Sequence, residues 1–171
     1  MIVNASPLII FGTLDKLEML RKVCTSIEIS QGVYDEVVVQ GIKKDLQDAR
    51  IIKAFVDENS IKVKQLSDTF ATQSKRISEI YSIEQGEAET ISLALQAHAA
   101  QVVIDEIAAR EAAKAFGLQP IGSLRILLLA YKDRMLSRKD VKDLVNQMVR
   151  TKYRFSPQIL LEFWHLMEKV K

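Results

Sequence analysis

The chain has 171 residues, of which 48% are hydrophobic and 27% are charged, and its formal net charge is +2. This size and composition favour one globular domain and exclude a disordered or low-complexity chain. The longest apolar runs are too short to cross a bilayer, no basic leader precedes the first apolar residues, and the single Cys24 fits a reducing compartment, so we expect a cytoplasmic protein.

Charge is distributed unevenly along the chain. Residues 120–171 contain 11 Lys or Arg and 5 Asp or Glu, whereas residues 1–119 contain 13 and 17. Within the basic third, residues 150–155 interleave cations with aromatic side chains, a pattern that suits phosphate contact and base stacking. The asymmetry is compatible with a polyanionic partner. A solvated helical face explains the charge asymmetry equally well, and an irregular connector whose aromatic side chains pack under the last helix explains residues 150–155 somewhat better.

The first residues are predicted to form a short buried strand that stops at Asn4 or Ala5. The chain then turns at Ser6 and Pro7 into a helix over about 7–20, because proline at the first helical position costs no intrahelical hydrogen bond. Polar groups directly after a central strand of an α/β sheet lie where such sheets usually bind ligands. This predicts a functional role for the start of the chain.

Strands and helices alternate along the rest of the chain. Strands are predicted over 26–30, 61–64, 101–104 and 118–121, and helices over 31–41, 45–57, 68–82, 87–97, 107–116, 124–135, 137–149 and from 156 onward. This alternation predicts a mostly parallel sheet. The most hydrophobic strands, 1–4 and 102–104, should be central, and the strand 61–64, which alternates with lysine, should lie at an edge. If the two central strands are neighbours where the strand order reverses, Asn4 and Asp105 face one crevice.

Oxygen-bearing side chains cluster at the ends of predicted elements. The candidates are Asn4, Ser6, Glu36, Glu87, Glu89, Asp105 and Glu106. Oxygen ligands without His or Cys suit Mg²⁺ or Mn²⁺ rather than zinc. Each residue alone also has an ordinary explanation, as an exposed helix residue, a helix-start charge or an N-cap. Glu87 and Glu89 are about 200° apart around a helix, so only one of them can face a given site.

Six segments, in this order and spacing, resemble PIN-domain proteins of the small prokaryotic type, in a branch related to VapC-type toxin ribonucleases. They are residues 3–9 (VNASPLI), 33–38 (VYDEVV), 86–94 (GEAETISLA), 103–110 (VIDEIAAR), 117–122 (GLQPIG) and 127–130 (LLLA). The resemblance implies a three-layer α/β/α fold with a central, mostly parallel sheet of about four to five strands. It places the PIN-like domain in residues 1–136, with residues 137–171 as a helical extension packed on the same domain.

The resemblance also implies an activity, which is Mg²⁺- or Mn²⁺-dependent hydrolysis of RNA phosphodiester bonds. The chain would then be the toxin component of a toxin–antitoxin pair. The implied partners are RNA, an antitoxin protein and a second copy of the chain as a homodimer, with no membrane partner.

Carried over residue by residue, the resemblance places Asn4, Glu36, Glu87 and Asp105 at the catalytic positions. Glu36, Glu87 and Asp105 would bind the metal, with Glu89 and Glu106 as the alternatives to the last two, and Ser6 would bind substrate. Asn4 stands where the family usually has its first aspartate, and its amide brings no charge. The alternatives are therefore a PIN-fold module that binds nucleic acid or protein with weak or no turnover, and an interaction protein assembled through its C-terminal helices.

Overall fold

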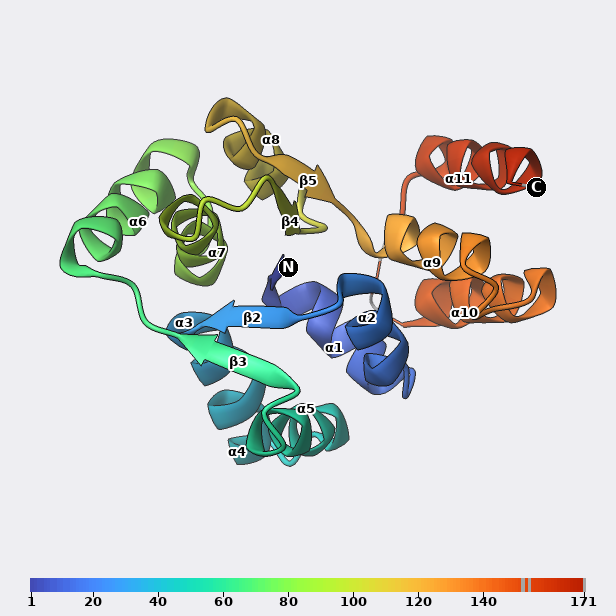
Figure 1. Cartoon of the computed structure of the whole chain (residues 1–171), viewed down its shortest axis with the longest axis horizontal. Coiled ribbons are helices and arrows are strands. Elements are labelled where there is room, and N and C mark those ends of the chain that lie inside the picture. The colour runs from blue at the N-terminus through green and yellow to red at the C-terminus, as the bar shows by residue number, and fades with distance from the viewer. Residues whose placement is uncertain (152, 154, 171) are drawn as a thin grey trace. The chain divides into compact units, whose positions relative to one another are not determined.

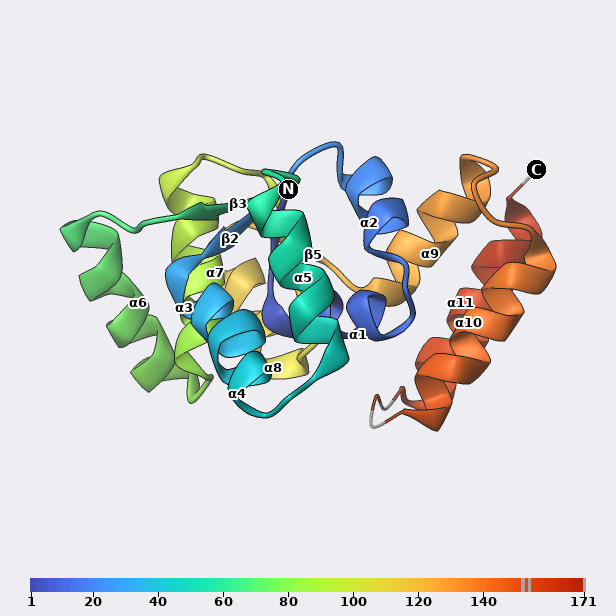
Figure 2. The same cartoon turned by 90° about the horizontal axis from the view of Figure 1, so that it is seen from below.

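The computed structural model describes residues 1–151, 153 and 155–170 (Figures 1 and 2). Contacts between residues divide the chain into two compact units, Met1–Gly122 and Ser123–Lys171. Each unit is described by itself below. The predicted domain boundary after residue 136 remains a prediction, as does the packing of residues 137–171 on the same domain.

The first unit is built on a five-stranded, all-parallel sheet with the strand order β3-β2-β1-β4-β5. The strands are β1 (Ile2–Val3), β2 (Ile27–Ser30), β3 (Ile61–Lys64), β4 (Gln101–Val103) and β5 (Gln119–Ile121). The chain runs from β1 outward to β3 and then returns to β4 on the other side of β1. The predicted parallel sheet, the central pair β1 and β4, and the edge position of β3 are all confirmed.

Helices flank this sheet and form the outer layers of the α/β/α fold. They are α1 (Ala5–Thr13), α2 (Leu17–Cys24), α3 (Gln31–Tyr34), the π-helix η1 (Asp35–Gln40), α4 (Gly41–Lys43), α5 (Gln47–Asp57), α6 (Asp68–Tyr81), α7 (Gln85–Gln96) and α8 (Ile107–Ala115). Figure 2 shows α3, α4 and α5 following one another beside β2 and β3. The order of the strands reverses between β1 and β4, and α/β sheets bind ligands at the carboxyl ends of the strands at such a point.

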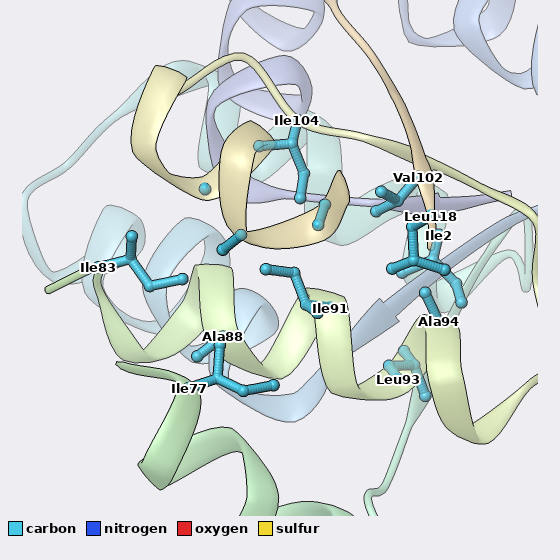
Figure 3. Packing of buried hydrophobic residues seen from close by; sticks show 13 residues of the cluster. Ile2, Ile77, Ile83, Ala88, Ile91, Leu93, Ala94, Val102, Ile104 and Leu118 are labelled. Carbon is cyan, nitrogen blue, oxygen red and sulfur yellow. The ribbon is translucent and has the colours of Figure 1, made fainter. Parts of the chain in front are cut away.

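A hydrophobic cluster fixes α7 against the centre of the sheet. Ile2 and Val102 contribute to it from the neighbouring strands β1 and β4, and Ile91 and Ala94 contribute from α7 (Figure 3). All four side chains are at most 2% exposed, and burial of an Ile or Val side chain contributes about 1.5–3 kcal/mol. This packing sets the position of α7, and with it that of Glu87, relative to the end of β1.

The predicted helix over 7–20 is instead two helices. The first begins at Ala5 and ends at Thr13, and the second begins at Leu17. Between them Asp15 has a φ of 53°, a left-handed conformation that interrupts the helix. Pro7 is the third residue of α1 rather than the first. It is tolerated there because the amides of the first helical turn have no intrahelical acceptor.

The predicted helix over 31–41 is helical throughout and continues to Lys43, but it changes its winding in the middle. After α3 the chain forms a π-turn over Asp35–Gln40 and then returns to α-helix in α4. The expected spacing of apolar residues at i and i+4 does not reveal such a turn. Single π-turns inside α-helices are rare and are frequently found at functional sites, and this one carries Glu36.

The second unit contains the helices α9 (Ser123–Lys132), α10 (Arg138–Arg150) and α11 (Pro157–Lys169), and α9 contacts the other two. A capping box begins α10, because the Ser137 hydroxyl accepts a hydrogen bond from the Asp140 N–H at 3.1 Å and the Asp140 carboxylate accepts one from the Ser137 N–H at 2.8 Å. In the predicted nucleic-acid stretch 150–155, Lys152 and Arg154 lie outside the described residues. No helix in the described part of the chain has the length and apolar character that a membrane crossing requires.

Candidate functional site

An acidic pocket of about 430 Å³ lies in the first unit, at the carboxyl ends of β1 and β4. Ten residues line it: Asn4, Ala5, Ser6, Glu36, Ser82, Ile83, Glu84, Glu87, Glu106 and Ala108. Four of these carry carboxylates, and no Lys, Arg or His is among them. The pocket therefore lies where the order of the strands predicts a ligand site.

Asn4 directly follows strand β1 and lines this pocket. It is the N-cap of α1 with an extended backbone, and its N–H donates to the Val103 carbonyl oxygen of β4 at 3.0 Å. Only 2% of Asn4 is exposed. Because backbone pairing with β4 holds this residue, its side chain enters the pocket from the centre of the sheet.

Both ends of the Asn4 side-chain amide form hydrogen bonds. Its Nδ2 donates to Glu106 Oε2 at 3.4 Å, and its Oδ1 accepts from the Thr90 hydroxyl at 3.0 Å. The Ser6 hydroxyl donates to the other carboxylate oxygen of Glu106, Oε1. Asn4 and Ser6 thus orient the Glu106 carboxylate, and an aspartate at position 4 would have no N–H for this purpose.

Glu87 is held at the pocket by the start of its own helix. Its Oε2 accepts from the Glu84 N–H at 2.9 Å, and the Glu84 side chain accepts from the Glu87 N–H, which together form a capping box. The pKa of Glu87 is raised to about 7: burial raises it most, the nearby carboxylates of Glu106, Glu84 and Glu36 add to this, and the hydrogen bond from the Glu84 N–H partly offsets it. Glu87 therefore ionises near neutral pH, in a place where a cation would stabilise the charged form.

Glu36 reaches the pocket from the π-turn and lies against the start of α7. Its Oε2 is 3.1 Å from the position that a Cβ atom would take on Gly86. Burial raises the pKa of Glu36, and the carboxylates of Glu84 and Glu106 raise it further, while Lys44 lowers it. Glu36 and Glu87 thus share a partly desolvated environment with excess negative charge.

The predicted residues Asn4, Ser6, Glu36 and Glu87 all line the pocket, but Asp105 does not. Its Oδ1 lies instead 2.9 Å from the position of a Cβ on Gly122, where Arg110 Nη1 is also close at 3.3 Å. The alternative, Glu106, lines the pocket in its place.

Glu89, the alternative to Glu87, also lies outside the pocket lining. Its carboxylate accepts a hydrogen bond from the Gly32 N–H at 2.9 Å. Sequence reasoning missed Glu84 altogether. Its signal is the spacing of Glu84 and Glu87, three residues apart at a helix start, which matches a capping box with glutamate in place of the usual serine or threonine.

The chemistry of the pocket fits a hard divalent cation. Its candidate ligands are the carboxylate oxygens of Glu36, Glu87 and Glu106, the donors that Mg²⁺ and Mn²⁺ prefer. The pKa values of Glu36 and Glu87 are raised first by burial and then by the neighbouring carboxylates. Among the described residues, no three His, Cys, Asp or Glu side chains are close enough to hold an ion as they stand. Cation binding would therefore require these side chains to change their conformations.

The parallel sheet and the carboxylate pocket at its switch point define an α/β protein with a candidate metal site. A family model described as a PIN domain matches residues 1–169, so the chain belongs to the PIN-domain family. PIN domains have a nuclease-type fold and generally use divalent metals. No curated protein matches the chain significantly.

The Glu87→Gln substitution tests the charge environment of the pocket. The pKa of Glu87 is about 7 in the folded protein against 4.5 for an ordinary glutamate, so its ionisation costs stability as pH rises between these values. Glutamine removes this cost and can still accept from the Glu84 N–H. At about pH 8 and without metal, we expect the variant to be about 1–2 kcal/mol more stable than the wild type, after allowance for solvent screening.

Urea unfolding with a chelator at about pH 4.5 and about pH 8 measures this effect, since an ordinary Glu is about half protonated at the lower pH and fully ionised at the higher pH. The gain should disappear at the lower pH, where Glu87 is largely protonated in the folded state. Glu79→Gln, at an exposed position on α6, is the matched control and should change little at either pH. An equal gain for Glu87→Gln at both pH values would contradict the raised pKa.

Proposed function

We propose that this PIN-domain protein is a Mg²⁺- or Mn²⁺-dependent ribonuclease that hydrolyses RNA phosphodiester bonds. The observation that carries the proposal is the convergence of Glu36, Glu87 and Glu106 on one pocket at the switch point of the sheet. These residues come from three separate parts of the chain. A purely structural role accounts poorly for this arrangement, because neighbouring carboxylates repel one another unless a cation offsets their charge, and one of them, Glu87, is buried.

In this proposal Glu36, Glu87 and Glu106 hold the cation. A bound divalent cation of this kind supplies an activated water and neutralises charge on the phosphate. Asn4 and Ser6 orient the Glu106 carboxylate through their hydrogen bonds to its two oxygens. Glu106 takes the position first assigned to Asp105 because it lines the pocket, and Ser6 is also a candidate to contact the substrate.

Cleavage of a mixed RNA pool tests the activity directly. The wild-type protein should cleave RNA with Mn²⁺ or Mg²⁺ and stop when a chelator is added. Glu36→Gln should lower the rate about 100-fold, because it removes one charged ligand while keeping the shape of the side chain. Glu79→Gln is the control and should retain full activity. Cleavage that persists in the chelator or in Glu36→Gln would contradict the proposal, and a DNA pool of the same sequences tests the preference for RNA.

We also propose that the chain acts as the toxin of a toxin–antitoxin pair, with an antitoxin protein and a second copy of the chain as partners. The resemblance to VapC-type toxins supports this role, and the cytoplasm would be its site of action. Expression of the wild type should arrest growth, whereas the Glu36→Gln variant should not. Co-expression of the neighbouring gene product should restore growth, and a wild type that never slows growth would contradict the toxin role.

Asn4 supports a second candidate function, a PIN-fold module that binds nucleic acid or protein without turnover. Its amide brings no charge to the pocket and is engaged by Thr90 and Glu106. A binding module should associate with RNA in the absence of divalent cation, and the affinity should fall steeply with salt. It should also show no heat of Mn²⁺ binding, whereas the nuclease should bind Mn²⁺.

A further inference from the structure

The Glu89 carboxylate of α7 contacts the backbone of Gly32, which lies at the beginning of the helical segment that carries Glu36. The Gly32 N–H donates to Glu89 Oε2 at 2.9 Å. A Cβ atom on Gly32 would lie 2.5 Å from that oxygen and 2.8 Å from the carboxyl carbon of Glu89. The carboxylate therefore lies directly on the backbone at Gly32, and no larger residue fits there without displacing it.

This contact completes the N-terminal cap of the segment. Amides in the first turn of a helix have no intrahelical acceptor and need partners from elsewhere. Ser30 Oγ accepts from the Val33 N–H at 3.2 Å, so the local chain supplies one partner. Glu89 supplies the other from α7, and its negative charge also complements the positive end of the helix dipole.

A second close approach joins the same two helices beside the pocket. Glu36 Oε2 lies 3.1 Å from the position of a Cβ on Gly86. Gly86 and Glu89 are three residues apart on α7, while Gly32 and Glu36 are four apart on the other segment, so each pair occupies one helix face. Two contacts one turn apart determine how the two helices align along their length.

We propose that Glu89 is a positioning residue, which holds the helical segment 31–43 against α7 so that the Glu36 carboxylate enters the pocket. This inference rests on the proposed function, because it assigns Glu89 a task in the site that binds the metal. The task is to accept one backbone hydrogen bond, not to bind the cation. Glutamine can perform it through its amide oxygen, whereas alanine cannot.

The test compares Glu89→Gln with Glu89→Ala by calorimetric Mn²⁺ binding. The Glu89→Ala variant should bind Mn²⁺ about 10-fold more weakly, as expected when the support of a metal ligand is removed, and Glu89→Gln should stay within about 3-fold of the wild type. Glu79→Ala is the control for loss of a helix glutamate and should not change the affinity. If Glu89 binds the cation itself, Glu89→Gln loses affinity as severely as Glu89→Ala, and that result would overturn the proposal.

Two measurements without metal separate this inference from the proposed function. Amide exchange at Gly32 should be about 10-fold faster in Glu89→Ala and nearly unchanged in Glu89→Gln, because opening of the cap exposes this N–H. An NMR titration of Glu36 should show its raised pKa return toward the ordinary value in Glu89→Ala only. If the wild type binds no Mn²⁺ but Glu89→Ala shows both effects, the metal-dependent function is refuted and the positioning role is retained.

Both metal-free readouts also have an outcome that refutes the positioning role. Unchanged Gly32 exchange and an unchanged Glu36 titration in Glu89→Ala would overturn it, whatever the protein does with metal. If Glu89→Ala fails to fold, Glu89→Gln decides alone, since near-normal Mn²⁺ affinity supports a positioning role and a large loss overturns it.

Discussion

Glu106→Gln is expected to reduce Mn²⁺-dependent RNA cleavage at least about 100-fold, whereas Asp105→Asn should reduce it about 10-fold or less. The two residues are adjacent, but only Glu106 lines the pocket. Its carboxylate accepts hydrogen bonds from Asn4 and Ser6, which hold it for cation binding. Asp105 lies against Gly122 instead. Its side chain does not line the pocket, so its charge influences the pocket only from outside.

Both substitutions remove one charge and preserve side-chain shape, so each serves as the matched control for the other. Initial cleavage rates at saturating Mn²⁺ and circular dichroism of each variant give the comparison. Calorimetry adds an independent measure, because Glu106→Gln should also weaken Mn²⁺ binding. A larger loss for Asp105→Asn in both measurements would return the third metal-ligand position to Asp105.

Asn4→Asp is expected to make the stability of the protein depend on divalent cation. The Asn4 amide N–H donates to the Glu106 carboxylate, and only 2% of Asn4 is exposed. Aspartate replaces that donor with a second buried negative charge, so without metal at neutral pH we expect a loss of about 2 kcal/mol. The added carboxylate should also raise Mn²⁺ affinity at least about 10-fold, and binding should restore the lost stability.

Urea unfolding with a chelator measures the loss of stability without metal, and urea unfolding with saturating Mn²⁺ measures how far cation binding restores it. Asn146→Asp, at an exposed position on α10, is the matched control and should respond to neither condition. Equal stability of Asn4→Asp and wild type in the chelator would show that the Asn4–Glu106 contact does not constrain position 4. Unchanged Mn²⁺ affinity would show that position 4 lies outside the metal site.

The position of the site in the fold could be predicted from hydrophobic patterns. Met1–Val3 and 101–104 are the most apolar strands, and buried strands in an alternating α/β chain pair in parallel at the centre of the sheet. If the two strands are neighbours, as the pairing of β1 and β4 shows, their polar ends, Asn4 and 105–106, lie close together at the carboxyl ends of the strands. Membership of the PIN-domain family confirms the PIN-domain part of the resemblance found in the segments around these residues.

The choice between neighbouring acids could not be predicted in the same way. Asp105 and Glu106 follow the last strand residue, where the regular alternation of side chains between the two faces of the sheet no longer applies. For Glu87 and Glu89, helical geometry required that only one face the site, but it did not say which. The capping box with Glu84 and the hydrogen bond from Gly32 decide that question. The capping box is local, but the hydrogen bond from Gly32 to Glu89 joins residues 57 apart and depends on tertiary structure.

The hydrogen bonds of Asn4 also determine when the pocket can exist during synthesis of the chain. Its partners Thr90 and Glu106 follow it by 86 and 102 residues. Contacts between residues so distant in sequence form late, because a long loop must close before they stabilise the fold. A nascent chain shorter than about 110 residues therefore has Asn4 and Glu36 without a complete pocket, so any nuclease activity begins only after most of the first unit has left the ribosome.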